Sequence, residues 1–182
     1  KSHAQRIKRF RLASYGGLSV HYSTCNITNC IFTENKFWTL FPANATINVT
    51  NCTFYDNFSY DIYNHVSTVV VKNSILNSYG NSSGTTTIKY TLLKTKPGAS
   101  NDFTLSNNIY EQDASFVGAS SGNFRLSSYS PCKGKGEYGV DMGVNFSASP
   151  SYTQNNDDDD NNSNANITSS GSIITSPQQK IK

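Results

Sequence analysis

Side chains that could carry out acid–base chemistry gather in one stretch of the chain. Asp56, Asp61 and His65 lie close together in the sequence, and Lys72 follows them. Carboxylates and imidazoles act as general acids and bases, and a pair of carboxylates can hydrolyse a glycosidic bond. These residues are spaced like loop residues, however, and no paired-aspartate motif accompanies them. We therefore assign no catalytic residue and expect no catalysis by this segment alone.

Aromatic side chains form a second group of candidates. They occur in segments that resemble surface loops, at Phe37, Trp38, Phe41, Tyr55, Phe58, Tyr60 and Tyr63. Aromatic rings in loops are suited to stacking on sugars or to contact with another protein. The same rings could instead cover the flank of the fold without binding anything. The sequence leaves both interpretations open.

Composition limits the class of protein. The chain of 182 residues is long enough for one domain, and its 15% of charged residues is well below the ~25% of ordinary domains. Its polarity comes from amides and hydroxyls, including 22 Asn, which favours strands and turns. No apolar run approaches the ~18 residues of a transmembrane helix. The basic residues of 1–11 are crowded at one end of the sequence, and the run at 157–160 is acidic. Neither forms a basic face for nucleic acid, so we expect no nucleic-acid partner.

A repeat organises the middle of the chain. The windows ITNCIFTEN at 27–35, VTNCTFYDN at 49–57 and VKNSILNSY at 71–79 recur with a 22-residue period, and looser copies that begin at Ile88 and Leu105 follow with a 17-residue period. One such unit cannot bury its own apolar residues, whereas stacked units make a continuous interior. The repeat therefore predicts a coil of short parallel strands.

The columns of this alignment predict which residues face the interior. The first and sixth columns are apolar or aromatic in every unit, and the third holds Asn in four of five units. Asn tolerates the left-handed backbone of a sharp bend, and its amide can bond to the amide of the next layer. We predict that columns one, four and six point inward. We also predict that segments 37–46 and 58–65 leave the 22-residue units as loops.

The four cysteines, Cys25, Cys30, Cys52 and Cys132, show no Cys-x-x-Cys spacing, so we predict no metal site and no cofactor. Cys30 and Cys52 share the fourth column of adjacent units, where a layer spacing of ~4.8 Å permits a disulfide. We favour two buried thiols there. Nine Asn-x-Ser/Thr sequons occur, at Asn26, Asn44, Asn48, Asn51, Asn57, Asn81, Asn145, Asn161 and Asn166. Asn51 belongs to the predicted bend and should be unavailable, so we expect any glycosylation to be confined to loops and tail.

An irregular stretch, 113–143, follows the repeats. It contains a recognisable series at Asp113, Phe116, Val117, Gly122, Asn123, Phe124, Arg125, Leu126, Ser130, Pro131, Gly136, Asp141 and Gly143. This series resembles the ending of right-handed parallel β-helix proteins of the pectin-lyase-like superfamily, of the choice-of-anchor Q type. Ala114, Gly118 and Cys132 depart from that pattern. The resemblance implies an all-β fold, a single-stranded right-handed parallel β-helix (solenoid) with a C-terminal cap and a disordered tail.

We divide the chain accordingly. Residues 1–11 are expected to be the basic N-terminal edge of a fragment, the C-terminal portion of a longer protein. Residues 12–146 hold the β-helix coils and the cap, in which Phe116, Phe124 and Leu126 should cover the exposed end of the last coil. Residues 147–182 are expected to form a low-complexity Asn/Asp/Ser linker or tail.

Two functions follow from the resemblance. The first is a secreted or cell-surface structural or adhesive module, a repeat glycoprotein whose partner is a polysaccharide, a surface glycan or a protein. The second is the C-terminal part of a polysaccharide lyase or glycoside hydrolase whose active residues lie on earlier coils. Both place the protein outside the cell or at its surface. The sequence does not predict an oligomeric state.

Overall fold

The computed structural model describes residues 8–10, 17–98, 102–146 and 168–170. This part of the chain is all-β, with two short 3₁₀ helices, η1 (Ala119–Ser121) and η2 (Glu137–Gly139), and no α-helix. None of its helices is long enough to span a membrane. The strands are β1 (Lys8–Phe10), β2 (Leu18–His21), β3 (Thr24–Thr28), β4 (Cys30–Thr33), β5 (Leu40–Ala43), β6 (Thr46–Thr50), β7 (Thr53–Tyr55), β8 (Ile62–Lys72), β9 (Ile75–Leu76), β10 (Tyr79–Lys89), β11 (Leu92–Leu93), β12 (Phe103–Ser106), β13 (Ile109–Tyr110), β14 (Phe116–Gly118), β15 (Asn123–Leu126) and β16 (Thr168–Ser170).

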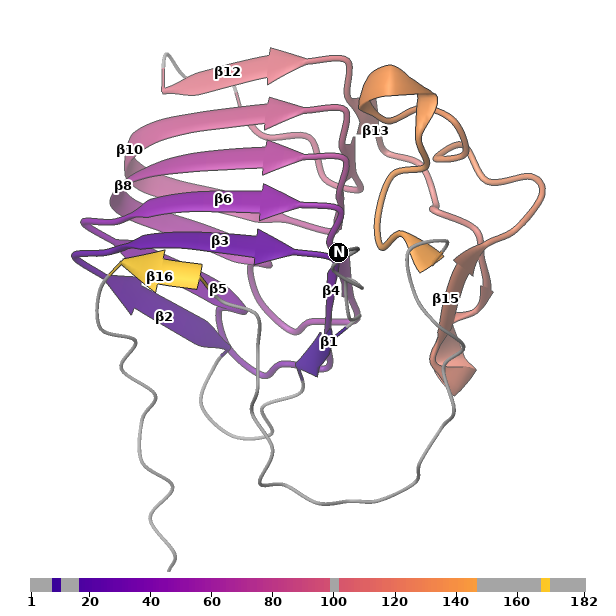
Figure 1. The fold of residues 1–182 in the computed structure, drawn as a ribbon, viewed down its shortest axis with the longest axis horizontal. Helices are drawn as coiled ribbons and strands as arrows, with labels where there is room; N and C mark the ends of the chain where they lie inside the picture. The colour runs from indigo at the N-terminus through magenta and orange to yellow at the C-terminus, as the bar shows by residue number, and fades with distance from the viewer. Residues whose placement is uncertain (1–7, 11–16, 99–101, 147–167, 171–182) are drawn as a thin grey trace, which may run out of the picture.

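The strands stack as parallel coils in the predicted register. Ile27 pairs with Val49 and Val49 with Val71, as the 22-residue period requires. Ile88 then pairs with both Val71 and Leu105, as the 17-residue period requires. Figure 1 shows β3, β6, β8, β10 and β12 lying one above the next. The repeat read from the sequence is confirmed as a stack of parallel strands.

Each coil has three flanks. Flank 1 consists of β2, β5 and the first parts of β8 and β10, and flank 2 consists of β3, β6, the last parts of β8 and β10, and β12. Flank 3 consists of β1, β4, β7, β9, β11 and β13. The sequence predicts only the strands of flanks 2 and 3, because the repeated windows end before flank 1 begins.

Left-handed residues make the corners between the flanks. The third-column residues all have φ between 48° and 56°, which confirms the predicted bend between flanks 2 and 3; they are Asn29, Asn51, Asn73, Tyr90 and Asn107. A second series, which lies outside the repeated windows, occurs between flanks 1 and 2. Its members are Tyr22, Asn44 and Val66, which follow the same 22-residue period and have φ between 50° and 53°.

The expected stacking of third-column amides in the interior is wrong. The side chain of Asn29 exchanges hydrogen bonds with the backbone of Asn145, and the Asn73 Oδ1 accepts one from the Glu137 N–H. The Asn51 Oδ1 is buried without a hydrogen-bond partner. The amides of Asn29 and Asn73 therefore bond to the terminal segment, defined here as residues 113–146, and not to each other.

The fourth column points inward as predicted and carries the hydrogen bonds between coils. The Ser74 Oγ accepts a hydrogen bond from the Cys52 N–H at 3.1 Å and donates one to the Lys72 carbonyl at 2.7 Å. Thr91 and Asn108 repeat the arrangement, accepting from the backbone N–H of Ser74 and Thr91 respectively. Each of these side chains supplies the acceptor that a buried corner N–H requires.

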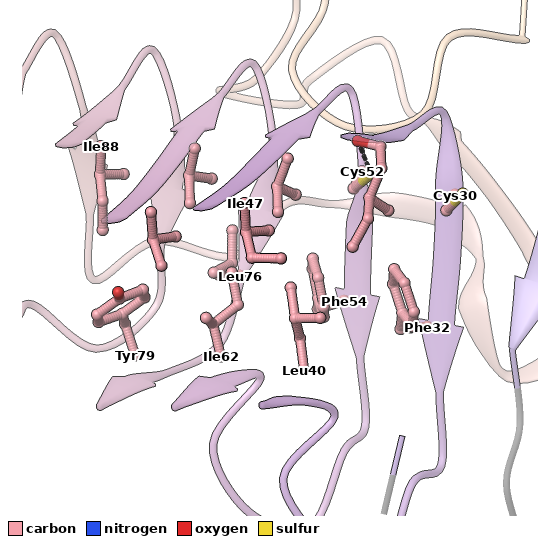
Figure 2. Packing of buried hydrophobic residues seen from close by; sticks show 14 of the residues in the cluster. Cys30, Phe32, Leu40, Ile47, Cys52, Phe54, Ile62, Leu76, Tyr79 and Ile88 are labelled. Atoms are coloured by element: carbon pink, nitrogen blue, oxygen red, sulfur yellow. Dashed lines mark hydrogen bonds between the residues drawn. The ribbon is translucent and has the colours of Figure 1, made fainter. Parts of the chain in front are cut away.

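The interior is a narrow apolar column. Figure 2 shows Leu40, Ile62, Leu76 and Ile88 pointing into the space between the flanks, together with stacked rings of Phe32 and Phe54. These two rings, from successive coils, lie with centroids 4.6 Å apart and planes 11° apart. The first and sixth columns are thus confirmed as core.

The predicted loops 37–46 and 58–65 are corrected by the structure. They contain β5 and the start of β8, which are strands of flank 1. The extra length that distinguishes long coils from short ones falls at the corner between flanks 3 and 1. Eight positions separate Phe54 from Ile62 there, but three separate Leu76 from Tyr79, the pairing partner of Ile62 in the next coil.

The cap lies in a different place from that predicted. The terminal segment packs along the outer side of flank 3 and does not close the last coil (Figure 1). Its Phe124 packs against Ile31, and its Met142 packs against Ile75 and Leu92. The outward column of flank 3 is largely aliphatic, so covering it removes apolar surface from water.

Two strands lie at the start of the described chain, where β2 pairs in parallel with β5 and β1 pairs in parallel with β4. The domain limits stay a prediction. Within 147–182 the structure describes only β16, which pairs antiparallel with β3. The expected disorder of the rest of that segment lies outside the described residues.

Replacing Asn51 tests the corner conformation. Asn51→Ala should lower the free energy of unfolding by about 1 kcal/mol, because alanine resists a left-handed φ. Asn51→Gly, measured beside it by thermal denaturation, should unfold close to the wild-type temperature, because glycine adopts this φ freely. Equal losses in the two variants would show that the amide, and not the backbone, sets the stability of the corner.

Replacing Ser74 tests the fourth column. Ser74→Ala should lower the free energy of unfolding by ~1–3 kcal/mol, because the buried Cys52 N–H loses its acceptor. Ser74→Thr is the matched control, since Thr91 fills the equivalent place in the next coil with its hydroxyl. Denaturant melts in which alanine and threonine behave alike would contradict the role of the hydroxyl.

Candidate functional site

Flank 1 carries a group of contacting aromatic side chains on its outer surface. We call Phe37, Trp38, Phe41, Tyr60 and Tyr63 the aromatic patch. Phe41 lies on β5 and Tyr63 on β8, and the other three lie in the long corners, residues 34–39 and 56–61. The 22-residue register aligns Trp38 with Tyr60 and Phe41 with Tyr63. The coil repeat therefore brings rings from two successive coils together.

The patch has an inner stack and an outer pair of rings. Trp38 stacks on Tyr63 with centroids 4.7 Å apart and planes 9° apart, and on Phe41 at 4.9 Å and 21°. Phe37 is turned 70° from Trp38, and Tyr60 is turned 38° from Tyr63. Phe37 is 54% exposed and Tyr60 is 42% exposed. The inner rings support one another, and the outer two offer ring surface to solvent.

The strands beneath fix these rings. A Cβ added to Gly80 would lie 2.7 Å from the Tyr63 ring and 3.1 Å from the Tyr60 ring, so both rings rest on the glycine backbone. His65 stacks on Phe41 at 6.0 Å, and its Nδ1 lies 2.8 Å from the Ser82 Oγ. A ring held in this way loses little conformational entropy when a ligand binds.

A buried polar network supports the corners that carry Trp38 and Tyr60. The Asn35 Nδ2 donates to the Asn57 Oδ1 at 2.9 Å, and the Asn57 Nδ2 donates to the Asp61 Oδ1 at 2.9 Å. The Asp61 Oδ2 accepts from the backbone N–H groups of Asn77 and Ser78. Burial raises the pKa of Asp61 from 3.8 to about 6, and these hydrogen bonds only partly oppose the rise.

The outer surfaces of the two other flanks have different side chains. The outer side of flank 2 is polar: the Asn48 Nδ2 donates to the Asn26 Oδ1 at 2.8 Å, and a column of threonines runs beside them at Thr24, Thr46, Thr68 and Thr85. The outer side of flank 3 is apolar and is covered by the terminal segment. Of the three flanks, flank 1 is the one whose own strands and corners present a group of contacting rings to solvent in the part of the chain that the structure describes. The exposed Tyr129 and Tyr138 belong to the terminal segment.

The candidate acid–base residues are not brought together. Asp61 is fully buried in the corner network, whereas Asp56 and His65 are exposed at separate places. The Lys72 ammonium lies 3.3 Å from the Glu137 carboxylate of the terminal segment. The arrangement provides no pair of carboxylates poised over a common substrate position.

Two of the aromatic candidates lie apart from the patch. Tyr55 packs beneath the terminal segment, with its ring 5.5 Å from Phe124 and 5.9 Å from Phe116. Phe58 is 83% exposed at the tip of its corner. The other five candidates make up the patch.

The four cysteines are buried, and none of them is joined in a disulfide. Cys30 and Cys52 are neighbours in the fourth column, as the interpretation of two thiols requires (Figure 2). Burial raises the pKa of Cys25 to about 11 and that of Cys132 to about 12, so neither is a reactive thiolate at neutral pH. No group of metal-ligating side chains occurs among residues whose placement is described.

The sequon residues differ in accessibility. Asn26 and Asn44 are exposed, whereas Asn57 belongs to the buried corner network and Asn145 bonds to Asn29. Asn161 and Asn166 lie outside the described residues.

A cavity of about 270 Å³ lies between flank 3 and the start of the terminal segment. Ile75, Leu92 and Phe116 provide apolar lining, while Lys94 and Asp113 provide charge. It is on a different flank from the aromatic patch. Nothing in the repeat pattern indicates this cavity, because it depends on where the terminal segment packs.

Sequence reasoning also missed the corner network and the contacts of Phe41 with His21 and His65. A signal for the network was present, since Asn35 and Asn57 share the ninth column of the first two windows. The contacts of the histidines could not be identified, because the repeated windows do not reach flank 1.

Comparisons with protein-family models, with curated proteins and with solved structures find no match.

The buried Asp61 predicts a pH dependence of stability. Its pKa is higher in the folded chain than in the unfolded chain, so the folded state binds the extra proton between about pH 4 and pH 6. The stabilisation is complete below about pH 4 and is lost as the pH rises through about 6, by up to about 3 kcal/mol. Urea melts across this range should show the loss in wild-type protein.

Asp61→Asn should reduce that slope, and Asp56→Asn, an exposed control, should keep it. A slope that is the same in all three proteins would show that Asp61 is not the responsible group.

Proposed function

We propose that the chain is part of a secreted or cell-surface right-handed β-helix of the pectin-lyase-like type, and that it binds carbohydrate through the aromatic patch. The parallel coils, with their 22- and 17-residue registers, are compatible with such a fold. The resemblance of residues 113–143 to the endings of those proteins supports the family and the location outside the cell.

The proposed binding function rests on the difference between the side chains on the outer surfaces of the flanks. On flank 2, threonine and asparagine side chains form the outer surface that the coil exposes to water. Rings on flank 1 are therefore not required merely to cover strands. Exposed apolar surface of this kind marks a site of interaction.

The geometry suits a sugar. The apolar C–H face of a sugar ring packs on an aromatic face, and Phe37 and Tyr60 offer such faces at the margin of a rigid stack. The separation of Asp56, His65 and Lys72 favours binding over catalysis. The segment then acts as a stiff module that holds a polysaccharide or surface glycan.

Binding can be followed through Trp38, the single tryptophan of the chain. Glycans retained on an array should alter its fluorescence, and Tyr60→Ala should weaken their binding about tenfold, because one stacking surface is lost. Tyr129→Ala is the matched control, since Tyr129 is 92% exposed in the terminal segment, away from the patch.

Equal binding by the two tyrosine variants would exclude the patch as the site. Retention of protein ligands with no glycan retained would contradict the carbohydrate class. Release of sugar products by the isolated chain would contradict a role limited to binding.

A further inference from the structure

The residues around the aromatic patch restrict the class of carbohydrate. None of the five patch residues is charged, and the strand residues beside them are uncharged or histidine. Outside the buried network, the exposed charges of the corners that carry the patch are one carboxylate, Asp56, and one ammonium, Lys36. A binding surface for a polyanion requires an excess of cations, and these corners show no such excess.

Three further lysines of the described coils lie away from the patch. Lys72 and Lys89 lie on flank 2, and Lys72 is paired with Glu137. Lys94 lines the cavity beside flank 3. These cations are therefore directed to surfaces other than the patch.

The polar atoms of the patch are neutral hydrogen-bonding groups. The hydroxyls of Tyr60 and Tyr63 and the indole N–H of Trp38 have no hydrogen-bond partner among the residues described. Such groups donate to or accept from sugar hydroxyls without requiring a charge on the ligand. Apolar ring faces with neutral polar groups beside them match an uncharged sugar, which also has an apolar face and hydroxyl edges.

The shape of the patch suits a chain of sugars more than a single unit. Its contacting rings extend from the 34–39 corner to β8 and so cover two successive coils. The outermost rings, Phe37 and Tyr60, come from different coils. A ligand that touches both must extend along the surface.

From these observations we infer that the ligand of the aromatic patch is an uncharged polysaccharide, not an acidic one of the pectin type. This inference rests on the proposed carbohydrate-binding function and narrows it to a substrate class. Binding should be driven by ring stacking and neutral hydrogen bonds, and it should therefore respond little to salt, unlike the binding of a polyanion.

The test is a titration of Trp38 fluorescence with soluble xylan, hydroxyethylcellulose and polygalacturonate at low and high salt. At least one neutral polymer should shift the emission, with an affinity that changes less than twofold with salt. Tyr60→Ala should weaken this binding about tenfold, and Tyr129→Ala should not. Polygalacturonate should bind at least tenfold more weakly than the neutral polymer.

The two levels of the proposal fail in different ways. Tighter, salt-sensitive binding of polygalacturonate that Tyr60→Ala abolishes would overturn the neutral class while supporting a carbohydrate site on the patch. No fluorescence change with any polymer, together with no effect of Tyr60→Ala on an array, would overturn both. Neutral polymer that binds equally to Tyr60→Ala and wild-type protein would also overturn both, because its site would lie elsewhere.

Discussion

A left-handed corner followed by an inward hydrogen-bonding residue is the unit on which this structure depends. The corner turns the chain from one flank to the next, and the next residue accepts the backbone N–H of the coil before it. Ser74, Thr91 and Asn108 do this at one corner, and Ser67 does it at another by accepting from the Ala45 N–H at 2.9 Å. Without these acceptors, N–H groups would be buried unpaired at each turn.

The sequence predicts the parts of the fold that depend on this unit. The 22- and 17-residue spacings give the register, the apolar columns give the core, and the Asn column gives the positions of left-handed φ. The columns do not reveal the partners of Asn29 and Asn73, because those belong to the terminal segment, far away in the sequence. Local patterns specify conformation here, while long-range packing specifies the hydrogen-bond partner.

The candidate site is less predictable for the same reason. Five of seven aromatic candidates form the patch, yet Tyr55 does not, because the terminal segment folds back over flank 3 and encloses it. The acid–base candidates close in sequence are separated because the corner buries Asp61 and leaves Asp56 outside. Nearness in sequence predicts little at a corner, where successive side chains point in different directions.

Because long and short coils differ at a single corner, coils can be added to such a protein by duplication in two ways. Among the described residues, the longer corner that carries rings such as Trp38 and Tyr60 occurs in 22-residue turns, while the first 17-residue turn passes directly from Leu76 to Tyr79. Duplication of one long turn would add another row of rings without disturbing the polar or the covered side. Duplication of a 17-residue turn would lengthen the stack of coils without adding rings. The length of the protein and the size of its binding surface can therefore evolve separately.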